Sequence, residues 1–396
     1  MISIQDKTQC SGCGACRNIC PKNAISMKAD AEGFLYPNVD DSLCVKCGLC
    51  LKVCPIINNT PPFHTGRIMA AKHKDENIRS AGSSGSMFSL LAQYALKRGG
   101  VVFGAAFDGK WNVVHQSAQD EQELDKLRRS KYVQSDMQEC FRLAKKFLQE
   151  GKTVLFTGTP CQIAGLKNYL GRDYASLITA DIICHGVPSP LVWRRFLEET
   201  LPLQDISAID FRYKRFGWDA SYLCIKKKDG ASLPEIKGLL KPFKSLLLRS
   251  KGRLFKIIYI LPFTISNLYE RPSCHACSFK GCDKYSDFTM ADLWGVKNFI
   301  PEMYDVKGVS VLMLNSPKAE DLFEELKNNL IYKDISFENM SQYNPYFMKS
   351  TEPSPFRAQF FDALINKKGS FYSLIRNKKG MKPLILKIIR FLGGAR

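Results

Sequence analysis

The stretch that decides the fold is a cysteine pattern that occurs twice near the N-terminus. It reads CSGCGACRNICP at residues 10–21 and CVKCGLCLKVCP at residues 44–55. Three thiolates on one tight loop can each reach a different iron of a single cubane cluster, whereas the fourth thiolate ligates the neighbouring cluster. The duplicated spacing therefore predicts two 4Fe-4S clusters that exchange their fourth ligands.

This duplication closely resembles a bacterial two-cluster ferredoxin. Its spacing assigns the first cluster to Cys10, Cys13, Cys16 and Cys54, and the second to Cys44, Cys47, Cys50 and Cys20. Glycines 12, 14 and 48 suit loops that wrap closely around a cluster, because glycine accepts backbone angles that other residues avoid. A disulfide framework or a pair of zinc sites also uses cysteine pairs, but neither predicts a duplicated triplet followed by Cys-Pro.

The chain of 396 residues is too long for a ferredoxin alone and has room for two or three domains. We expect a ferredoxin domain at 1–60, further domains at 67–190 and 191–345, and a basic amphipathic tail at 346–396. Most of the fifteen cysteines have metal-ligand spacings, and the first residues do not form a signal peptide. A reducing cytoplasm is therefore the expected compartment.

Beyond residue 67 the hydrophobic pattern alternates between strands and helices. Apolar residues at helical spacing predict a helix from Met87, and apolar runs predict strands at 101–107, 153–157 and 177–183. Further helices are expected at 136–149, from 160 to about 169, and at 317–329, with a hairpin at 209–228 and a strand at 309–315. The prediction is an α/β fold: an α+β ferredoxin module fused to an α/β domain with a mostly parallel sheet.

Four other cysteines lie in predicted turns. Cys161 and Cys184 each follow a predicted parallel strand, and Cys274 and Cys277 form a CxxC pair. Because carboxyl ends of parallel strands gather at one edge of a sheet, these thiols could meet there and form a third metal site. CxxC is also typical of zinc or redox chemistry, and Cys282 offers an alternative fourth ligand.

The net charge of +19 is concentrated in two segments. Residues 237–284 carry ten Lys/Arg and two acidic residues, and residues 366–396 carry nine Lys/Arg and no acidic residue. The apolar runs at 254–265 and 384–392 are too short to span a bilayer. They could contact the inner face of an anionic membrane peripherally, or pack on their own domain. No recognition motif accompanies the charge, so nucleic acid is not an expected partner.

Several segments carry a wider family resemblance. They are 157–166 (TGTPCQIAGL), 184–189 (CHGVPS), 211–214 (FRYK) with Trp218, and 286–295 (SDFTMADLWG). Over roughly residues 67–345 the chain resembles the beta subunit family of coenzyme F420 (deazaflavin) hydrogenases and dehydrogenases, which includes hydroxymethyl chlorophyll a reductase. The N-terminal diferredoxin and Trp294-Gly295 are similar to bacterial members encoded with polysaccharide biosynthesis enzymes.

The resemblance implies FAD and a third 4Fe-4S cluster held by Cys161, Cys184, Cys274 and Cys277. The candidate residues at the flavin are Ser83, Ser84, Gly85, Ser86, Ser130, Lys131, Tyr132, Gly158, Thr159 and Asp292. Asp292 could instead lie near the cluster or form a turn before Gly295. A helix start favours the FAD diphosphate, although a serine-rich N-cap explains residues 83–86 equally. Lys131 could stabilise reduced flavin or be a solvated loop charge. Cys282 has no place in this pattern, while Cys140 and Cys224 read as free buried cysteines.

His185 and His275, each beside an implied ligand, are candidate proton donors, or else make structural hydrogen bonds. The expected function is an iron-sulfur flavoprotein oxidoreductase that passes electrons between a ferredoxin-like carrier and an organic substrate. The similarity to members encoded with polysaccharide biosynthesis enzymes implies a role in that process. Alternatives are an electron-transfer subunit of a larger complex, a deazaflavin oxidoreductase, or a binding module with structural clusters. No GxGxxG motif supports nicotinamide binding.

Overall fold

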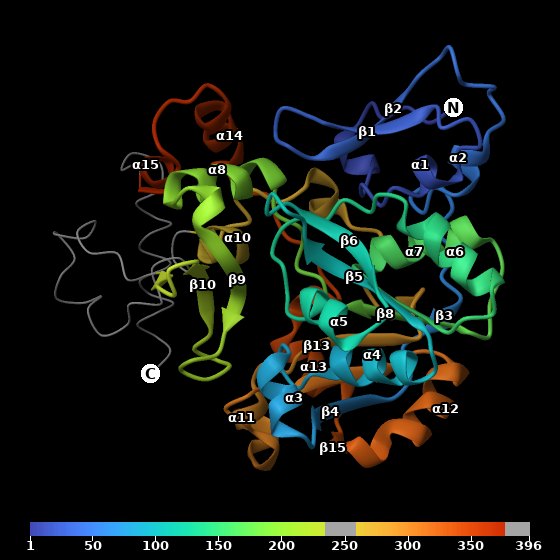
Figure 1. Ribbon diagram of the computed structural model, residues 1–396, viewed down its shortest axis with the longest axis vertical. Helices are drawn as coiled ribbons and strands as arrows, with labels where there is room; N and C mark the ends of the chain where they lie inside the picture. Colours follow the sequence, from blue (N-terminus) through green and yellow to red (C-terminus); the bar gives the residue numbers. More distant parts are fainter. Residues whose placement is uncertain (234–258, 377–396) are drawn as a thin grey trace.

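The structure, a computed structural model, describes residues 1–233 and 259–376 (Figure 1). The N-terminal module contains helices α1 (Ala15–Ile19) and α2 (Leu49–Lys52) and an antiparallel pair, β1 (Ile25–Ala29) and β2 (Leu35–Val39). The two cysteine triplets lead into α1 and α2 through equivalent glycines. Gly14 and Gly48, at φ 75° and 77°, cap the helices in the left-handed region, which is the conformation that glycine adopts without steric cost.

An eight-stranded sheet forms the centre of the remaining chain. In spatial order its strands are β15 (Leu330–Asp334), β4 (Ile68–His73), β14 (Ser310–Leu314), β13 (Phe288–Asp292), β8 (Leu177–Ile182), β7 (Val154–Thr157), β5 (Val101–Phe107) and β6 (Val113–Ala118). Neighbours β13, β8, β7 and β5 are parallel, and β4 runs in the same direction. The predicted α/β class with a large, mostly parallel sheet is confirmed.

Helices cover both faces of this sheet. Val102 and Ala106 of β5 pack in one core with α4 (Met87–Lys97), α5 (Glu121–Leu127) and α12 (Pro317–Leu326). Val101 and Phe103 pack on the other face with α6 (Cys140–Gln149), α7 (Pro160–Leu170) and part of the N-terminal module. Alternate residues of one strand thus enter opposite cores, as the period of two requires. The N-terminal module lies over α6 and α7 (Figure 1).

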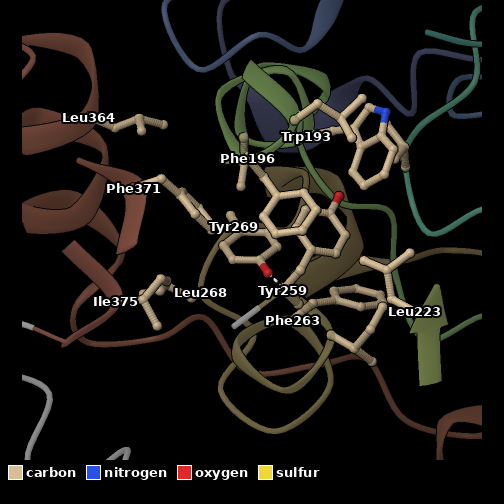
Figure 2. Packing of buried hydrophobic residues seen from close by; sticks show 14 of the residues in the cluster. Trp193, Phe196, Leu223, Tyr259, Phe263, Leu268, Tyr269, Leu364, Phe371 and Ile375 are labelled. Atoms are coloured by element: carbon tan, nitrogen blue, oxygen red, sulfur yellow. Dashed lines mark hydrogen bonds between the residues drawn. The ribbon is translucent and has the colours of Figure 1, made fainter. Parts of the chain in front are cut away.

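A second unit packs beside the sheet around an antiparallel hairpin. It comprises β9 (Ile206–Tyr213), β10 (Tyr222–Lys227), β11 (Ser232–Leu233), α8 (Pro190–Thr200), α10 (Leu261–Thr264), α14 (Arg357–Ile365) and α15 (Phe371–Arg376). Figure 2 shows its core, where the rings of Trp193, Phe196, Tyr259 and Phe371 converge. The remaining elements are short: β3 (Phe63–His64), α3 (Glu76–Ala81), β12 (Asp283–Lys284), α11 (Val296–Phe299) and α13 (Phe337–Tyr343).

The predicted hairpin is present, but several boundaries differ from the prediction. Helix α6 begins at Cys140 rather than at residue 136, and α12 ends at Leu326 before a 3-10 turn. Strand β4 was not predicted, because Lys72 and His73 interrupt its apolar run although both are buried. Strands from 67–190 and from 191–345 share the one sheet.

Parts of the sequence predictions fall outside the described residues. Most of the basic charge at 237–284 and 366–396, residues 254–258 of the apolar run at 254–265 and all of 384–392 lie there. Residues 259–263 of the first run are described and are buried in the second unit. Membrane contact by these segments therefore stays a prediction. Within residues 1–233 and 259–376, no helix is long and apolar enough to cross a membrane.

Phe196→Ala tests the importance of the aromatic core for stability. Phe196 is fully buried, so its truncation is expected to lower the free energy of unfolding by about 3–5 kcal/mol, measured by urea denaturation under anaerobic conditions. The matched control is Phe216→Ala, because Phe216 is 60% exposed, and its expected effect is within about 0.5 kcal/mol. Equal losses from the two substitutions would contradict the described packing.

Candidate functional site

The N-terminal module brings the second cysteine triplet together with a cysteine from the first repeat. Cys20, Cys44, Cys47 and Cys50 line one cavity, which measures about 390 Å³ including its open mouth. Cys20 reaches it because α1 ends at Ile19 and the chain turns there into Pro21. This is the grouping that the duplicated spacing predicts, and these four thiols could hold a 4Fe-4S cluster.

The other four cysteines of the module also lie near one another. Burial raises the pKa of Cys16 to about 12, and the neighbouring Cys10 and Cys54 thiols contribute to this rise. Burial likewise raises the pKa of Cys13 well above its usual value, with a contribution from Cys16. Thiols in such surroundings are protonated when free, and bind metal as thiolates with release of their protons.

A third set of four thiols lines a separate cavity at the carboxyl edge of the sheet. The cavity measures about 730 Å³ including its mouth, and its lining includes Cys161, Cys184, Cys274 and Cys277. Cys161 lies in the first turn of α7 after β7, Cys184 follows β8, and the CxxC pair lies at a 3-10 turn, Pro272–Ala276. Cys282 does not line this cavity but packs against the hydrophobic core that includes Leu293 and Phe347.

The chemistry of the third set is that of buried thiols. Burial raises the pKa of Cys161 to about 11 and that of Cys184 to about 12. Among the described residues, no three His, Cys, Asp or Glu side chains are grouped as a single metal ion requires. The four thiols line one cavity, and a cluster held there would have its irons and sulfides between them.

The third set adjoins the first through helix α7. A methyl group at Gly165 would lie 3.0 Å from Cys13 Sγ, so the Cys10–Cys16 loop rests directly on this helix. Gly165 is four residues after Cys161 and therefore on the same helix face. Ser11 of the same loop lines the third cavity. The three sets of thiols thus form a series from the N-terminal module into the sheet.

Buried polar groups surround the third cavity. His185, next to Cys184, has Nε2 2.9 Å from Glu270 Oε1 and 3.0 Å from Asn267 Oδ1. His275 Nδ1 lies 3.1 Å from Thr351 Oγ1, and burial lowers the pKa of this histidine. Both histidines make hydrogen bonds that could simply stabilise the fold. A role for His185 as a proton donor stays a prediction.

The serine-rich loop before α4 is held by other segments. Ser83 Oγ lies 3.3 Å from Ser130 Oγ, and Ser84 Oγ donates to the carbonyl of Val309 at 2.6 Å. Gly85 N–H donates to Ser310 Oγ at 2.9 Å. Ser86 precedes α4 in the left-handed region, and its side chain does not cap the helix. The serine N-cap that could explain residues 83–86 is therefore not formed by Ser86.

The predicted site residue Asp292 forms an ion pair beside this loop with Arg212, to which the sequence analysis assigned no role. Asp292 Oδ2 accepts from Arg212 Nη1 at 2.6 Å, and Asp292 Oδ1 accepts from Trp218 Nε1 at 2.8 Å. Burial would raise the pKa of Asp292, but Arg212 and the Trp218 hydrogen bond hold it below its usual value. Arg212 also donates to Tyr132 Oη at 3.1 Å. The FRYK segment was the sequence signal that could have identified Arg212.

Lys214 of the same segment connects the pair to the serine loop. Its Nζ donates to the carbonyl of Ser84 at 3.1 Å, and burial lowers its pKa to about 8. Lys131 is placed differently, since its Nζ donates to the carbonyls of Lys126, Leu127 and Arg128 at the end of α5. Burial lowers the pKa of Lys131 to about 7. In this arrangement Lys131 caps a helix, and its flavin role stays a prediction.

The last two predicted residues, Gly158 and Thr159, lie between the sulfur sites and the sheet. Gly158 N–H donates to the carbonyl of Ala180, and Thr159 Oγ1 lies 3.2 Å from Cys161 Sγ. Thr159 is thus placed beside the third set of thiols. Gly158 lies near His115, which is buried at the base of this turn.

Cys20→Ser tests the exchanged ligation in the N-terminal module. Because Cys20 lies with Cys44, Cys47 and Cys50, the substitution is expected to remove or convert the cluster of the second triplet while leaving that of the first. Iron analysis and EPR of the reduced protein measure this. The control is Cys224→Ser, because Cys224 is a buried cysteine outside all three sets. Its iron content is expected to be unchanged. Selective damage to the first cluster by Cys20→Ser would refute the grouping.

Comparison with known proteins agrees with this geometry. The chain matches the family models for coenzyme F420 hydrogenase/dehydrogenase beta subunit, N-terminal part over residues 68–142 and C terminus over residues 151–338. It also matches a 4Fe-4S dicluster domain over residues 9–56. No curated protein matches significantly.

One solved structure that the chain matches is a chain of the F420-reducing [NiFe] hydrogenase complex from Methanosarcina barkeri. The identity is 15% and the TM-score 0.46, and the alignment covers 77% of this chain and 91% of the other. The two beta subunit models together span more than half of the chain. The chain therefore belongs to the coenzyme F420 hydrogenase/dehydrogenase beta subunit family, with a 4Fe-4S dicluster domain at its N-terminus.

Proposed function

We propose that this chain is an iron-sulfur flavoprotein oxidoreductase that passes electrons between a ferredoxin-like carrier and an organic substrate. The observation that carries the proposal is the series of three four-thiol sets, in which Gly165 allows Cys13 to approach the helix that bears Cys161. When bound, 4Fe-4S clusters carry electrons singly and FAD exchanges two electrons or a hydride, so the combination couples the two kinds of transfer.

In this proposal Cys161, Cys184, Cys274 and Cys277 hold a third 4Fe-4S cluster. Two lysines supply positive charge at its cavity: Lys280, whose Nζ donates to the carbonyls of Cys184 and Tyr346, and Lys284, which is buried. Cations beside buried thiolates favour the thiolate form that binds metal. None of the fifteen cysteines forms a disulfide.

We further propose that FAD binds where the serine loop, Arg212 and Asp292 meet. The first-turn N–H groups of α4 are not capped by Ser86, and such groups favour a phosphate. Arg212 Nη2 is buried and has no hydrogen-bond partner among the described residues. An unpaired guanidinium nitrogen is costly to bury, and an anionic or carbonyl oxygen of a bound ligand would satisfy it. Asp292 holds the guanidinium in place.

The carrier is proposed to dock where the second cluster site reaches the surface. Cys47 is exposed, and Leu43 and Val45 beside it are 50% and 58% exposed. Lys22 and Lys46 line the same cavity and are exposed. An apolar centre with lysines around it fits a small acidic electron carrier, since opposite charges steer such encounters.

The proposed substrate is an organic compound whose class follows only from the family. Deazaflavin is the first candidate, because the family description names coenzyme F420. A sugar or glycan precursor of polysaccharide biosynthesis is the second and rests on the resemblance alone. The term beta subunit also favours a role as an electron-transfer chain within a larger complex. Turnover by the isolated chain with a chemical reductant separates an enzyme from such a subunit.

Cys274→Ser tests the third cluster. Loss of one of four thiolates is expected to remove about four irons per chain, while the two N-terminal clusters remain. Cys282→Ser is the matched control, because Cys282 lies eight residues further along the chain but does not line the cavity. Iron and sulfide analysis measures both variants. Retention of all iron by Cys274→Ser, or its loss only in Cys282→Ser, would exclude the proposed ligand set.

Val45→Glu tests the docking face. A negative charge beside Cys47 is expected to slow reduction by an acidic bacterial ferredoxin about tenfold through like-charge repulsion. Reduction by dithionite, which needs no docking, is expected to be unchanged. Ile331→Glu on β15, at 43% exposure, is the control with normal rates for both reductants. Stopped-flow absorbance measures the rates, and equal slowing with both reductants would argue against docking at this face.

A further inference from the structure

Arg271 is a fully buried cation between two of the sulfur sites. Its side chain is 0% exposed, and it immediately precedes the turn that carries Cys274 and Cys277. The guanidinium points to the N-terminal module, where Nε donates to the carbonyl of Cys10 at 2.8 Å and Nη2 to that of Leu35 at 3.0 Å. Nη1 donates to Gln134 Oε1 at 2.9 Å. Three segments of the chain therefore meet on one side chain.

No carboxylate neutralises this charge. Within residues 1–233 and 259–376, Arg271 takes part in none of the ion pairs, and the adjacent Glu270 carboxylate faces His185 and Thr351 instead. The guanidinium stacks on the Tyr36 ring, with Cζ 4.2 Å from the centroid, which offsets only part of the cost. Burying an unpaired charge is expensive in a low-dielectric interior. The site therefore requires a counter-charge that the side chains do not provide.

Cysteine sites that become anionic when they bind iron lie on both sides of Arg271. The Cys10 carbonyl that accepts from Nε belongs to the first set of thiols, and Gln134, whose Oε1 accepts from Nη1, lines the cavity of the third set. A methyl group at Gly12 would lie 2.8 Å from Nη1 and 2.7 Å from Gln134 Nε2. The absence of a side chain at position 12 thus lets the first cysteine loop rest on the guanidinium.

We propose that Arg271 is the shared counter-cation of the first N-terminal cluster site and the third, and that it raises the reduction potentials of both while joining their loops. The part concerning the third site rests on the proposed function, whereas the part concerning the first rests on the dicluster domain alone. One electron added to a cluster increases its negative charge, so a fixed neighbouring cation favours the reduced form.

The geometry also explains why arginine serves here rather than lysine. Nε, Nη1 and Nη2 each bind a different acceptor, on the cysteine loop, on β2 and on the segment after Tyr132. A planar fork can bind three acceptors in fixed directions, whereas an ammonium supplies a point charge on a flexible stem. Arg271 is accordingly a positioning residue whose charge acts on the clusters and whose fork aligns the loops.

Arg271→Gln tests the charge, in the full chain purified anaerobically with its clusters. EPR-monitored redox titration is expected to show the first and third clusters reduced about tenfold less readily, a shift of about 59 mV to more negative potential for a one-electron couple. The second cluster, whose thiols lie away from Arg271, serves as the internal control and is expected to keep its potential. Arg271→Lys retains the charge and is expected to stay close to the wild-type potentials.

The matched control is the double variant Glu32→Gln with Arg357→Gln. It removes an ion pair that also joins the N-terminal module to the rest of the chain, without changing net charge, and is expected to leave all potentials unchanged. Unchanged potentials in iron-replete Arg271→Gln, or an equal shift of all three clusters, would overturn the proposal. If the glutamine variant does not retain iron, a tenfold shift in Arg271→Lys would overturn it. A wild-type protein with only two clusters would refute the third site but still leave the first cluster to test Arg271.

Discussion

The contact between the first cysteine loop and helix α7 at Gly165 is the constraint on which the arrangement of the molecule depends. There the N-terminal module and the sheet approach so closely that a single methyl group would meet Cys13 Sγ at 3.0 Å. Helix α7 starts at the carboxyl end of β7, so the same contact places the module beside the edge where Cys161 and Cys184 lie. The parallel centre of the sheet creates that edge. Because this edge of the sheet lies next to the N-terminal module, the cysteines of the two domains form one series of sulfur sites.

Charge compensation is the second theme of the structure. The three sets of thiols become anionic when they bind iron. Lys284, which is buried, and Lys280, which is partly buried, line the cavity of the third set, and the buried Arg271 precedes its CxxC turn. Burying a charged amine is unfavourable, and burial accordingly lowers the pKa of Lys284. Arg212 differs, because Asp292 neutralises it and leaves one nitrogen for a ligand. Of these four cations, Arg271, Lys280 and Lys284 therefore lie near the sulfur sites, and Arg212 lies at the proposed flavin site.

Local spacing made much of this predictable from the sequence. The duplicated triplets specify the exchange of Cys20, and strand-turn patterns brought Cys161 and Cys184 to one edge, because both rest on short-range geometry. Strand β4 was not predicted because it contains Lys72 and His73, which are charged or polar and yet buried. Lys72 donates a hydrogen bond to the carbonyl of Met303, a residue far away in the sequence. Arg212, Asp292 and Trp218 meet only through the tertiary fold, as do Arg271 and Cys10. Such long-range polar contacts leave no periodic signal in the sequence.

The central claim is that three clusters and one flavin share this chain. The most direct measurement is the content of iron, sulfide and flavin per polypeptide after anaerobic purification, with EPR of the dithionite-reduced protein. The account predicts about twelve irons, from three four-iron clusters, together with one FAD. About eight irons and no flavin would contradict it, and would reduce the chain to a diferredoxin joined to a domain without redox cofactors.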